Sequence, residues 1–357
     1  MLKTLQNAFK VKDVRHRIFY VLMMLVVIRI GSQLPVPGVD GSYFKTWFES
    51  QTGDAFNFLD AFTGGSFSQM SIFALSITPY ITSSIIIQLL TIAIPKLEEM
   101  QRDGEDGRKK LGAITRYVTI GLSLFESIAM AIGFGNKGLI PDNSFVKMVV
   151  VVVALTAGSA FLMWVGEQIN EKGVGNGISI VLLINIVSRI PSDMTKLYES
   201  FMKGKIIAKA LLSGVIIAAI IVGVVILVII LNGAERRIPV QYSKKMQGRK
   251  MMGGQSSHIP LKVNTAGVIP VIFASSIMSF PSVIASFLGK TGGTGIGGKI
   301  LAGMNSNNWF DLEHPWYSIG LVAYIVMVIF FAYFYTSITF NPLEVADNMK
   351  KQGGFIP

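Results

Sequence analysis

Residue types that carry out enzyme chemistry are sparse in this sequence, and none occurs in a recognisable catalytic spacing. The three histidines, His16, His258 and His314, fall in predicted loops or at the edge of an apolar segment. The sequence contains no His-Glu-x-x-His, Gly-x-Ser-x-Gly or phosphate-loop pattern, so it encodes no recognisable metalloprotease, serine hydrolase or nucleotide site. Cysteine is absent, which excludes disulfides and thiolate-bound metal centres. We therefore predict a protein that is not an enzyme and that binds no metal or cofactor.

The composition indicates an all-α polytopic membrane protein. Of the 357 residues, 51% are hydrophobic and only 15% are charged, whereas a soluble domain carries about 25% charged residues. Apolar stretches of roughly 20 residues, the length that crosses a bilayer as a helix, recur along the chain. The eight predicted spans cover residues 17–34, 71–94, 115–134, 145–166, 177–190, 207–231, 264–288 and 317–340. A shorter apolar segment at 54–67 cannot cross, and its composition is typical of a re-entrant half-helix.

The distribution of lysine and arginine predicts the orientation in the membrane. If the amino terminus is cytoplasmic, 21 of the 32 Lys and Arg residues fall in cytoplasmic segments and 10 fall outside, with Arg29 inside the first span. An excess of positive charge marks the cytoplasmic side of membrane proteins. Both ends of this chain are therefore predicted to be cytoplasmic, in a multi-pass protein of the cytoplasmic (inner) membrane.

The predicted spans are almost free of charged groups near their middles. Ion-coupled transporters place Asp, Glu or His there, and Glu126 in the third span is the main exception here. A secondary transporter with broken helices is nevertheless the alternative hypothesis. A membrane-insertion chaperone without a pore is a third possibility.

A short sequence echo links the second and seventh predicted spans. Pro79 is followed two residues later by Ile81, Pro270 is followed two residues later by Ile272, and a Ser-Ser pair comes shortly after each. The echo suggests an internal repeat of five spans. Chance is the alternative explanation, because Pro, Ile and Ser are common in membrane helices.

Four separated motifs resemble the SecY family, the central channel-forming subunit of the bacterial Sec protein translocase. They read SIFALSITPYITSSIIIQLL, MWVGEQINEKGVGNGISI, QGRKMMGGQSSHIPLKVNTAGVIPVIFASSI and FNPLEVADNMKKQGGFIP. The resemblance implies ten spans in two pseudo-symmetric halves of five. It assigns residues 1–190 to the first half and 207–357 to an incomplete second half, with a basic cytosolic loop at 232–262. By this comparison the chain ends before the last two spans.

The resemblance also implies a channel that passes unfolded secretory polypeptides across the membrane and releases membrane segments sideways into lipid. A ring of bulky aliphatic side chains would seal such a pore, because it dewets when closed and binds no particular sequence. The resemblance places that ring at Ile77, Ile81, Ile178, Leu182 and Ile272. The first four form two i,i+4 pairs, so each pair lies on one helix face. Such pairs in a membrane helix usually pack or face lipid, so spacing alone does not assign these residues to a pore.

The half-helix at 54–67 corresponds in this resemblance to the family's plug, which sits under the ring from the external side. Two glycines would supply a flexible joint, and four phenylalanines an apolar surface that seats against the ring. The expected plug residues are Phe56, Asn57, Phe58, Phe62, Gly64, Gly65 and Phe67. The alternative interpretation is an interfacial helix anchored by its aromatic residues.

The resemblance further implies a lateral gate and a set of partners. Thr82 and Phe280 match positions that flank the gate, and Gln88 and Asn264 are polar residues of the gate helices, for which routine helix packing is the better explanation. The basic loop would contact the ribosome and the SecA motor ATPase, which supply the energy, or would serve only as a topology anchor. Its cations are Arg236, Arg237, Lys244, Lys245, Arg249 and Lys250. Further expected partners are SecE-like and SecG-like subunits, signal peptides, nascent chains and membrane lipid.

Overall fold

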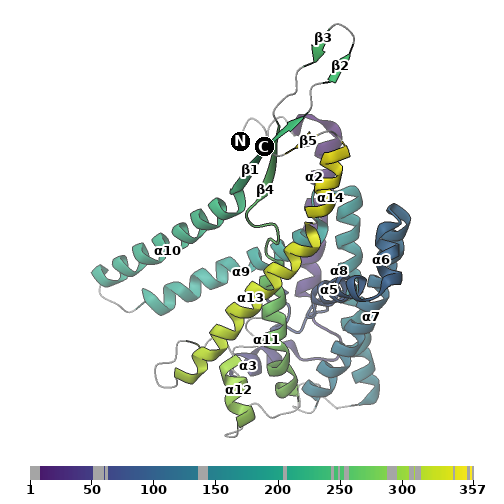
Figure 1. The fold of residues 1–357 in the computed structure, drawn as a ribbon. Coiled ribbons are helices and arrows are strands. Elements are labelled where there is room, and N and C mark those ends of the chain that lie inside the picture. The colour runs from purple at the N-terminus through teal and green to yellow at the C-terminus, as the bar shows by residue number, and fades with distance from the viewer. Residues whose placement is uncertain are drawn as a thin grey trace. The chain divides into compact units, whose positions relative to one another are not determined.

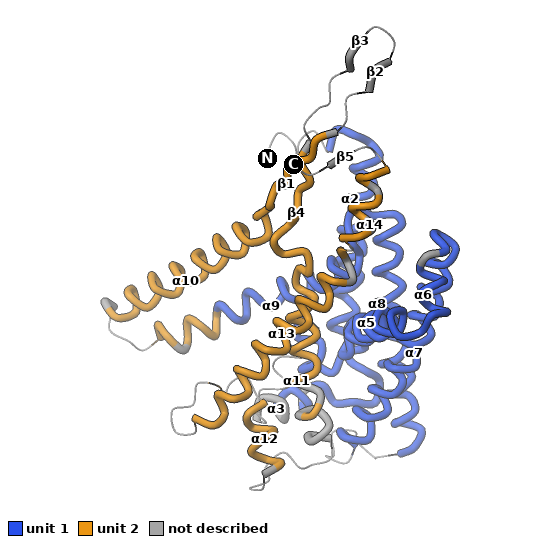
Figure 2. Tube along the Cα trace, viewed as in Figure 1, with its two compact units in different colours: residues 1–194, 282–294 blue, residues 195–281, 295–357 orange. Residues whose placement is uncertain are grey.

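The computed structural model shows a predominantly helical chain (Figure 1). It describes residues 9–50, 60, 63–135, 144–203, 207–242, 245–247, 250–252, 257–287, 296–304, 309, 315–340, 342–351 and 354–355. The chain divides into two compact units (Figure 2): unit 1 comprises residues 1–194 and 282–294, and unit 2 comprises 195–281 and 295–357. We describe each unit by itself, and the expected division into a 1–190 half and a 207–357 half stays a prediction.

Unit 1 is built from helices. They are α2 (Lys12–Gln33), α3 (Gly41–Ser50), α5 (Thr78–Ala93), α6 (Pro95–Arg102), α7 (Glu105–Gly135), α8 (Phe145–Lys172) and α9 (Gly177–Phe201), whose end beyond Met194 belongs to unit 2. Pro95 separates α5 from α6, because the residue before a proline avoids helical backbone angles, and Ile94 is indeed extended. The two helices meet at a bend of 108°. Gly158 of α8 has no side chain and so admits the backbone of Ile72 against the helix.

Unit 2 combines helices with a small sheet. Its elements are α10 (Ile207–Gly233), β1 (Glu235–Tyr242), β2 (Lys245–Gln247), β3 (Lys250–Met252), β4 (Ser257–Lys262), α11 (Ile269–Phe287), α12 (Ile296–Met304), the 3₁₀ turn η2 (Pro315–Tyr317), α13 (Ser318–Thr339), α14 (Pro342–Lys351) and β5 (Gly354–Phe355). The strand order is β4-β1-β5, all antiparallel, with Ile238 opposite Ile259, and β2 pairs with β3. The last six residues of α11 are grouped with unit 1.

Several predicted spans have different limits in the structure; the third, for example, begins at Glu105 rather than at 115. The second helix begins at Thr78 rather than at 71, because residues 71–77 form turns in which Ser76 has a φ of 52°. The fifth continues through Pro191 to Phe201, and the seventh begins only at Ile269. Within the described residues, five helices are long and apolar enough to cross a membrane, or six if the bent α5–α6 pair is one span. The count of eight spans stays a prediction.

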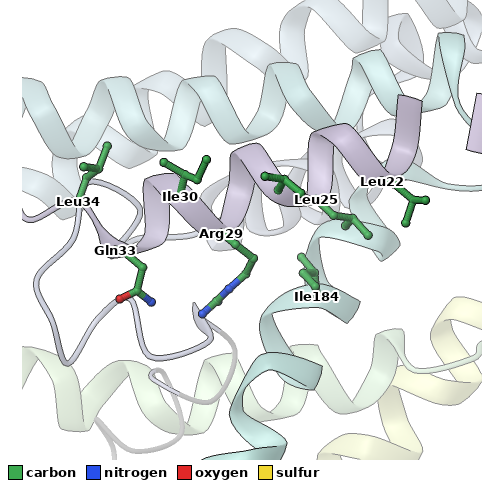
Figure 3. Close-up of a pocket in the computed structure, with 8 residues that line it drawn as sticks. Leu22, Leu25, Arg29, Ile30, Gln33, Leu34 and Ile184 are labelled. Carbon is green, nitrogen blue, oxygen red and sulfur yellow. The ribbon is translucent and has the colours of Figure 1, made fainter. Parts of the chain in front are cut away.

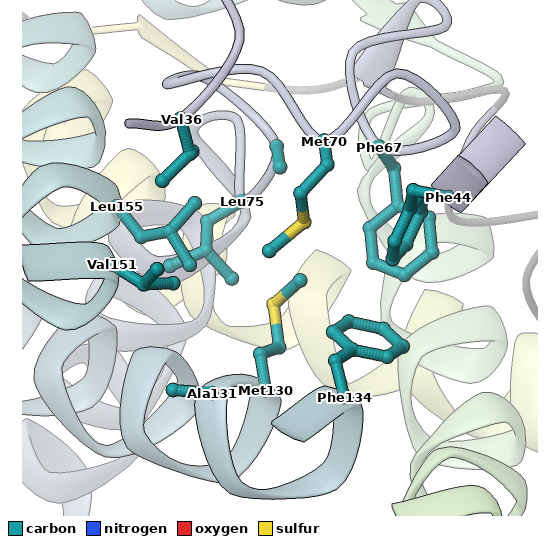
Figure 4. Close-up of a cluster of buried hydrophobic side chains, with 11 residues drawn as sticks. Val36, Phe44, Phe67, Met70, Leu75, Met130, Ala131, Phe134, Val151 and Leu155 are labelled. Carbon is teal, nitrogen blue, oxygen red and sulfur yellow. The ribbon is translucent and has the colours of Figure 1, made fainter. Parts of the chain in front are cut away.

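The larger buried core of unit 1 joins α3, the chain from 67 to 75, α7 and α8. Figure 4 shows Met70 and Met130 pointing toward each other beside the rings of Phe44, Phe67 and Phe134. The Phe44 and Phe134 rings meet edge to face with their centroids 4.9 Å apart, an arrangement that contributes beyond the buried area alone. This core therefore fixes a non-helical stretch of chain against the two longest helices of the unit.

Truncation of Phe134 should destabilise the protein far more than truncation of an exposed ring on the same helix. Phe134 is 2% exposed and Phe125 is 63% exposed. Removing a buried phenylalanine costs about 3–5 kcal/mol, so Phe134→Ala should lower the thermal unfolding midpoint in detergent, whereas Phe125→Ala should leave it nearly unchanged. Equal midpoints for the two variants would contradict the core as described.

Candidate functional site

Four of the five expected ring residues lie in one hydrophobic cluster of unit 1. Ile77 is completely buried there, and Ile81, Ile178 and Leu182 are partly buried against the same cluster. A Cβ atom at Gly166 of α8 would lie 3.4 Å from Ile178 Cγ1 and 3.6 Å from Ile77 Cδ1, so these two side chains cover the same point of α8. The structure thus brings four of the residues that the resemblance assigns to the ring into one cluster. Their role in lining a pore stays a prediction, and the complete burial of Ile77 favours packing for that residue.

The fifth ring residue, Ile272, belongs to unit 2, where it is partly buried on α11. Its neighbour Phe273 packs edge to face on Phe331 of α13 with ring centroids 5.5 Å apart. Ser275 and Tyr324 share a hydrogen bond of 3.3 Å between the same two helices. These contacts hold α11 against α13.

Part of the expected plug lies outside the described residues, namely Phe56, Asn57, Phe58 and Phe62. Of the expected plug, the structure describes residues 60 and 63–67. Residues 63–77 are called the return segment below; after Thr63 they form turns, with a single bridge pair at Ser71. Phe67 belongs to the buried core, with its ring 6.2 Å from that of Phe44. Gly64 and Gly65 have φ values of 69° and 85°, which glycine adopts without strain. The joint expected at these glycines stays a prediction.

A polar network that we did not predict attaches this region to α9 and α2. Arg189 Nη1 of α9 donates to Asp60 Oδ2 at 2.8 Å, and Asp60 Oδ1 accepts the N–H of Ser68, also at 2.8 Å. Arg29 Nη1 of α2 donates to Ser188 Oγ at 2.9 Å and to the carbonyl oxygen of Gly64 at 3.5 Å. The sequence signal that could have predicted this network is the occurrence of the charged residues Arg29, Asp60 and Arg189 within or beside apolar stretches.

An apolar groove runs along α2 next to this network. Its volume is about 610 Å³, and Figure 3 shows Arg29 and Gln33 projecting from the same side of α2. Its lining consists of Leu22, Leu25, Val26, Arg29, Ile30, Gln33, Leu34 and Ile184 of α9. The lining is mostly apolar, with Arg29 and Gln33 as its two polar residues.

The expected gate residues make hydrogen bonds within their own units. In unit 1, Thr82 Oγ1 donates to the Thr78 carbonyl at 3.0 Å, and the exposed Gln88 donates to Ser84 Oγ at 3.2 Å. In unit 2, Asn264 Oδ1 accepts the N–H of Gly267 at 3.0 Å. Phe280 lies in α11, and its side chain is outside the described part of the chain. The lateral gate stays a prediction.

The basic loop at 232–262 contains an antiparallel ribbon that we did not predict. Arg236 and Arg237 are exposed on β1, opposite Leu261 and Pro260 of β4. Lys245 begins β2 and Lys250 begins β3. Lys244 and Arg249 lie outside the described residues. Arg236 and Arg237 are thus held exposed on a strand that is paired with β4.

Comparison with known proteins identifies the family. The SecY family model matches residues 71–357. The protein translocase subunit SecY of Halalkalibacterium halodurans is 43% identical over 362 residues, which cover all of this chain and 81% of that protein.

Two solved structures are similar in fold. One is a SecY structure, described by its plug domain, which stabilises the closed state of the translocation channel and maintains a membrane seal. It has a TM-score of 0.64 at 19% sequence identity, and the match covers 96% of this chain and 77% of that one. The other is Sec61 in the canine ribosome–channel complex from the endoplasmic reticulum, with a TM-score of 0.61 at 18% identity and coverage of 95% and 76%. Since the family match spans most of the chain and the bacterial relative is similar along its whole length, the chain belongs to the SecY family.

Proposed function

We propose that this chain is the protein-conducting channel subunit of a bacterial translocase, passing unfolded secretory polypeptides across the cytoplasmic membrane. The observation that carries the proposal is 43% identity over the whole chain to a protein translocase subunit SecY. SecY is a channel subunit rather than an enzyme, so the energy comes from partners, either a SecA-type ATPase or the translating ribosome. The secondary-transporter alternative gains no support from the family match.

The seal of the proposed pore is the aliphatic ring. Branched aliphatic side chains offer an unfolded polypeptide no fixed hydrogen-bond partner, and a narrow ring of them excludes water when closed. The clustering of Ile81, Ile178 and Leu182, each partly exposed, supports this role in unit 1. Ile272 would add the contribution of unit 2.

A photo-reactive residue at Ile81, Ile178 or Ile272 should cross-link to a secretory chain arrested on the ribosome, because the polypeptide must pass the ring. Matched control positions are Ile92 on α5 and Leu183 on α9, which are 55% and 59% exposed on the same helices as the first two. They should give much weaker cross-links. Equal labelling at ring and control positions would contradict the pore, and no labelling at any position would contradict the channel function itself.

Membrane segments would leave the pore sideways between helices that carry Thr82, Gln88, Asn264 and Phe280. Polar contacts between membrane helices contribute only about 0.6 kcal/mol on average. Such weak contacts suit a gate that an apolar signal helix must open. The plug, whose described part includes Gly64, Gly65 and Phe67, would seal the closed channel from the external side.

The basic ribbon would face the cytoplasm, with both ends of the chain on the same side, and would dock onto the ribosome or a SecA-type motor. Sec61 of similar fold is found in a ribosome–channel complex. Exposed cations such as Arg236 and Arg237 can neutralise ribosomal RNA phosphates without reading base sequence. SecE-like and SecG-like subunits would complete the channel in the lipid bilayer.

Charge reversal in the basic loop, Arg249→Glu with Lys250→Glu, should weaken ribosome binding. The loss of two phosphate contacts should reduce the slope of log affinity against log salt concentration by roughly one to two. Lys350→Glu with Lys351→Glu in α14 makes the same change in net charge and serves as the control. Binding should be measured by co-sedimentation of proteoliposomes with ribosomes over a salt series. Equal losses in both variants would indicate a general charge effect rather than a docking site.

A further inference from the structure

Unit 1 contains a buried ion pair between Asp60 and Arg189 of α9. Asp60 and Arg189 are joined at 2.8 Å, and their side chains are only 6% and 14% exposed. Arg189 also approaches Asp193 one turn later, at 3.6 Å, but that carboxylate is 49% exposed. Asp60 uses its second oxygen to accept the Ser68 N–H, so the same carboxylate binds both α9 and the return segment.

The polar contacts on α9 continue along one face of the helix. Ser188 accepts a hydrogen bond from Arg29 and donates one to the Asn185 carbonyl at 2.7 Å, while Asn185 Nδ2 donates to Ser76 Oγ at 3.0 Å. Residues three and four apart share a helix face. The polar face of α9 therefore holds the return segment near both of its ends, through Asp60 and through Ser76.

Between these two contacts the backbone of the return segment lies directly against α9. A Cβ atom at Gly64 would lie 2.7 Å from the carbonyl oxygen of Asn185 and 2.9 Å from Ser188 Oγ, whereas one at Gly65 would meet nothing within 4 Å. Gly64 is therefore required by a close backbone approach as well as by its φ value. The ion pair and the glycine contact act on the same stretch of chain.

A buried ion pair is a poor way to gain net stability, because packed apolar groups of the same volume are commonly as good or better. A buried ion pair can nevertheless fix the position of a segment, because displacement of either partner leaves a buried charge unpaired. Apolar packing already holds Phe67 and Met70. The ion pair thus adds a position-specific constraint to a segment that the core alone would retain.

We propose that Asp60 and Arg189 are positioning residues that clamp the plug region to α9 and thereby set how stringently the closed channel selects signal sequences. This inference rests on the proposed channel function. An ordinary signal sequence would supply enough binding free energy to displace the clamp, and a defective one would not. Weakening the clamp should therefore admit defective signals.

A double-mutant cycle tests the clamp without depending on transport. The chain contains no cysteine, so Ser68→Cys provides a unique thiol beside Asp60, and its rate of alkylation by a water-soluble maleimide reports release of the segment. In proteoliposomes of the full chain, Asp60→Asn and Arg189→Gln should each raise that rate several-fold. The double variant should be no faster than the faster single variant, because both changes break one interaction. Asp193→Asn is the matched control and should leave the rate unchanged.

Unchanged rates in both single variants, multiplied effects in the double variant, or an equal rise in Asp193→Asn would each overturn the clamp. Translocation of a secretory protein with a defective signal, in the same proteoliposomes with SecA, SecE and SecG added, then tests the consequence for selectivity. It should rise several-fold in Asp60→Asn and Arg189→Gln while an intact signal is used normally. Faster alkylation with no gain for the defective signal would overturn the link to selectivity. Absence of any translocation by the parent chain would instead count against the proposed function and leave the alkylation result to decide the clamp.

Discussion

Non-helical backbone in a membrane protein must find its hydrogen-bond partners inside the protein, and unit 1 is organised around that requirement. Many backbone groups of the return segment, residues 63–77, bond to its own turns and to neighbouring chain. The N–H of Val36 donates to the Met70 carbonyl at 3.0 Å, and the N–H of Ile72 donates to the Leu34 carbonyl at 2.9 Å. Ser159 Oγ of α8 reaches the Ser76 carbonyl at 3.2 Å. Loops and helices that are far apart in sequence thus converge because one stretch of backbone needs them.

The same requirement places the expected pore residues. Because the turns occupy residues 71–77, α5 begins with Thr78 and Pro79, and a proline in the first helical turn sacrifices no internal hydrogen bond. Ile77 precedes this start and is buried, while Ile81 lies one turn further along the helix and is only partly buried. A continuous helix from residue 71 would have removed the turns that bring Ser76 to Asn185. The start of α5 at Thr78 therefore leaves Ile77 beside the turn in which Ser76 contacts Asn185 of α9.

The sequence predicted features that depend on local pattern and missed those that depend on distant contacts. Runs of apolar residues located most of the long helices. Ile77 precedes the start of α5, so its expected pairing with Ile81 on one helix face stays a prediction. The run Ser71–Ile77 is apolar enough to suggest a helix, but it forms turns that contact Leu34, Ser159 and Asn185. The Asp60–Arg189 pair joins residues 129 positions apart, so spacing could not reveal it. The β1–β4 ribbon was missed because the positions of basic residues do not predict the pairing of residues 235–240 with residues 257–262.

Small polar residues line the packed face of an apolar helix in unit 1. Apolar side chains gain little from leaving lipid, so helices in a membrane associate where small residues allow close approach and hydrogen bonds. The buried face of α7 carries Thr115, Thr119, Ser123 and Ser127, and Thr156 of α8 donates to Ser127 Oγ at 3.1 Å. In contrast, no part of the most apolar stretch of α10 is buried among the described residues, although its mean hydropathy of 3.5 is the highest of the candidate spans. The Ser and Thr residues of α7 therefore form a packed face within unit 1, a feature that hydropathy alone does not predict.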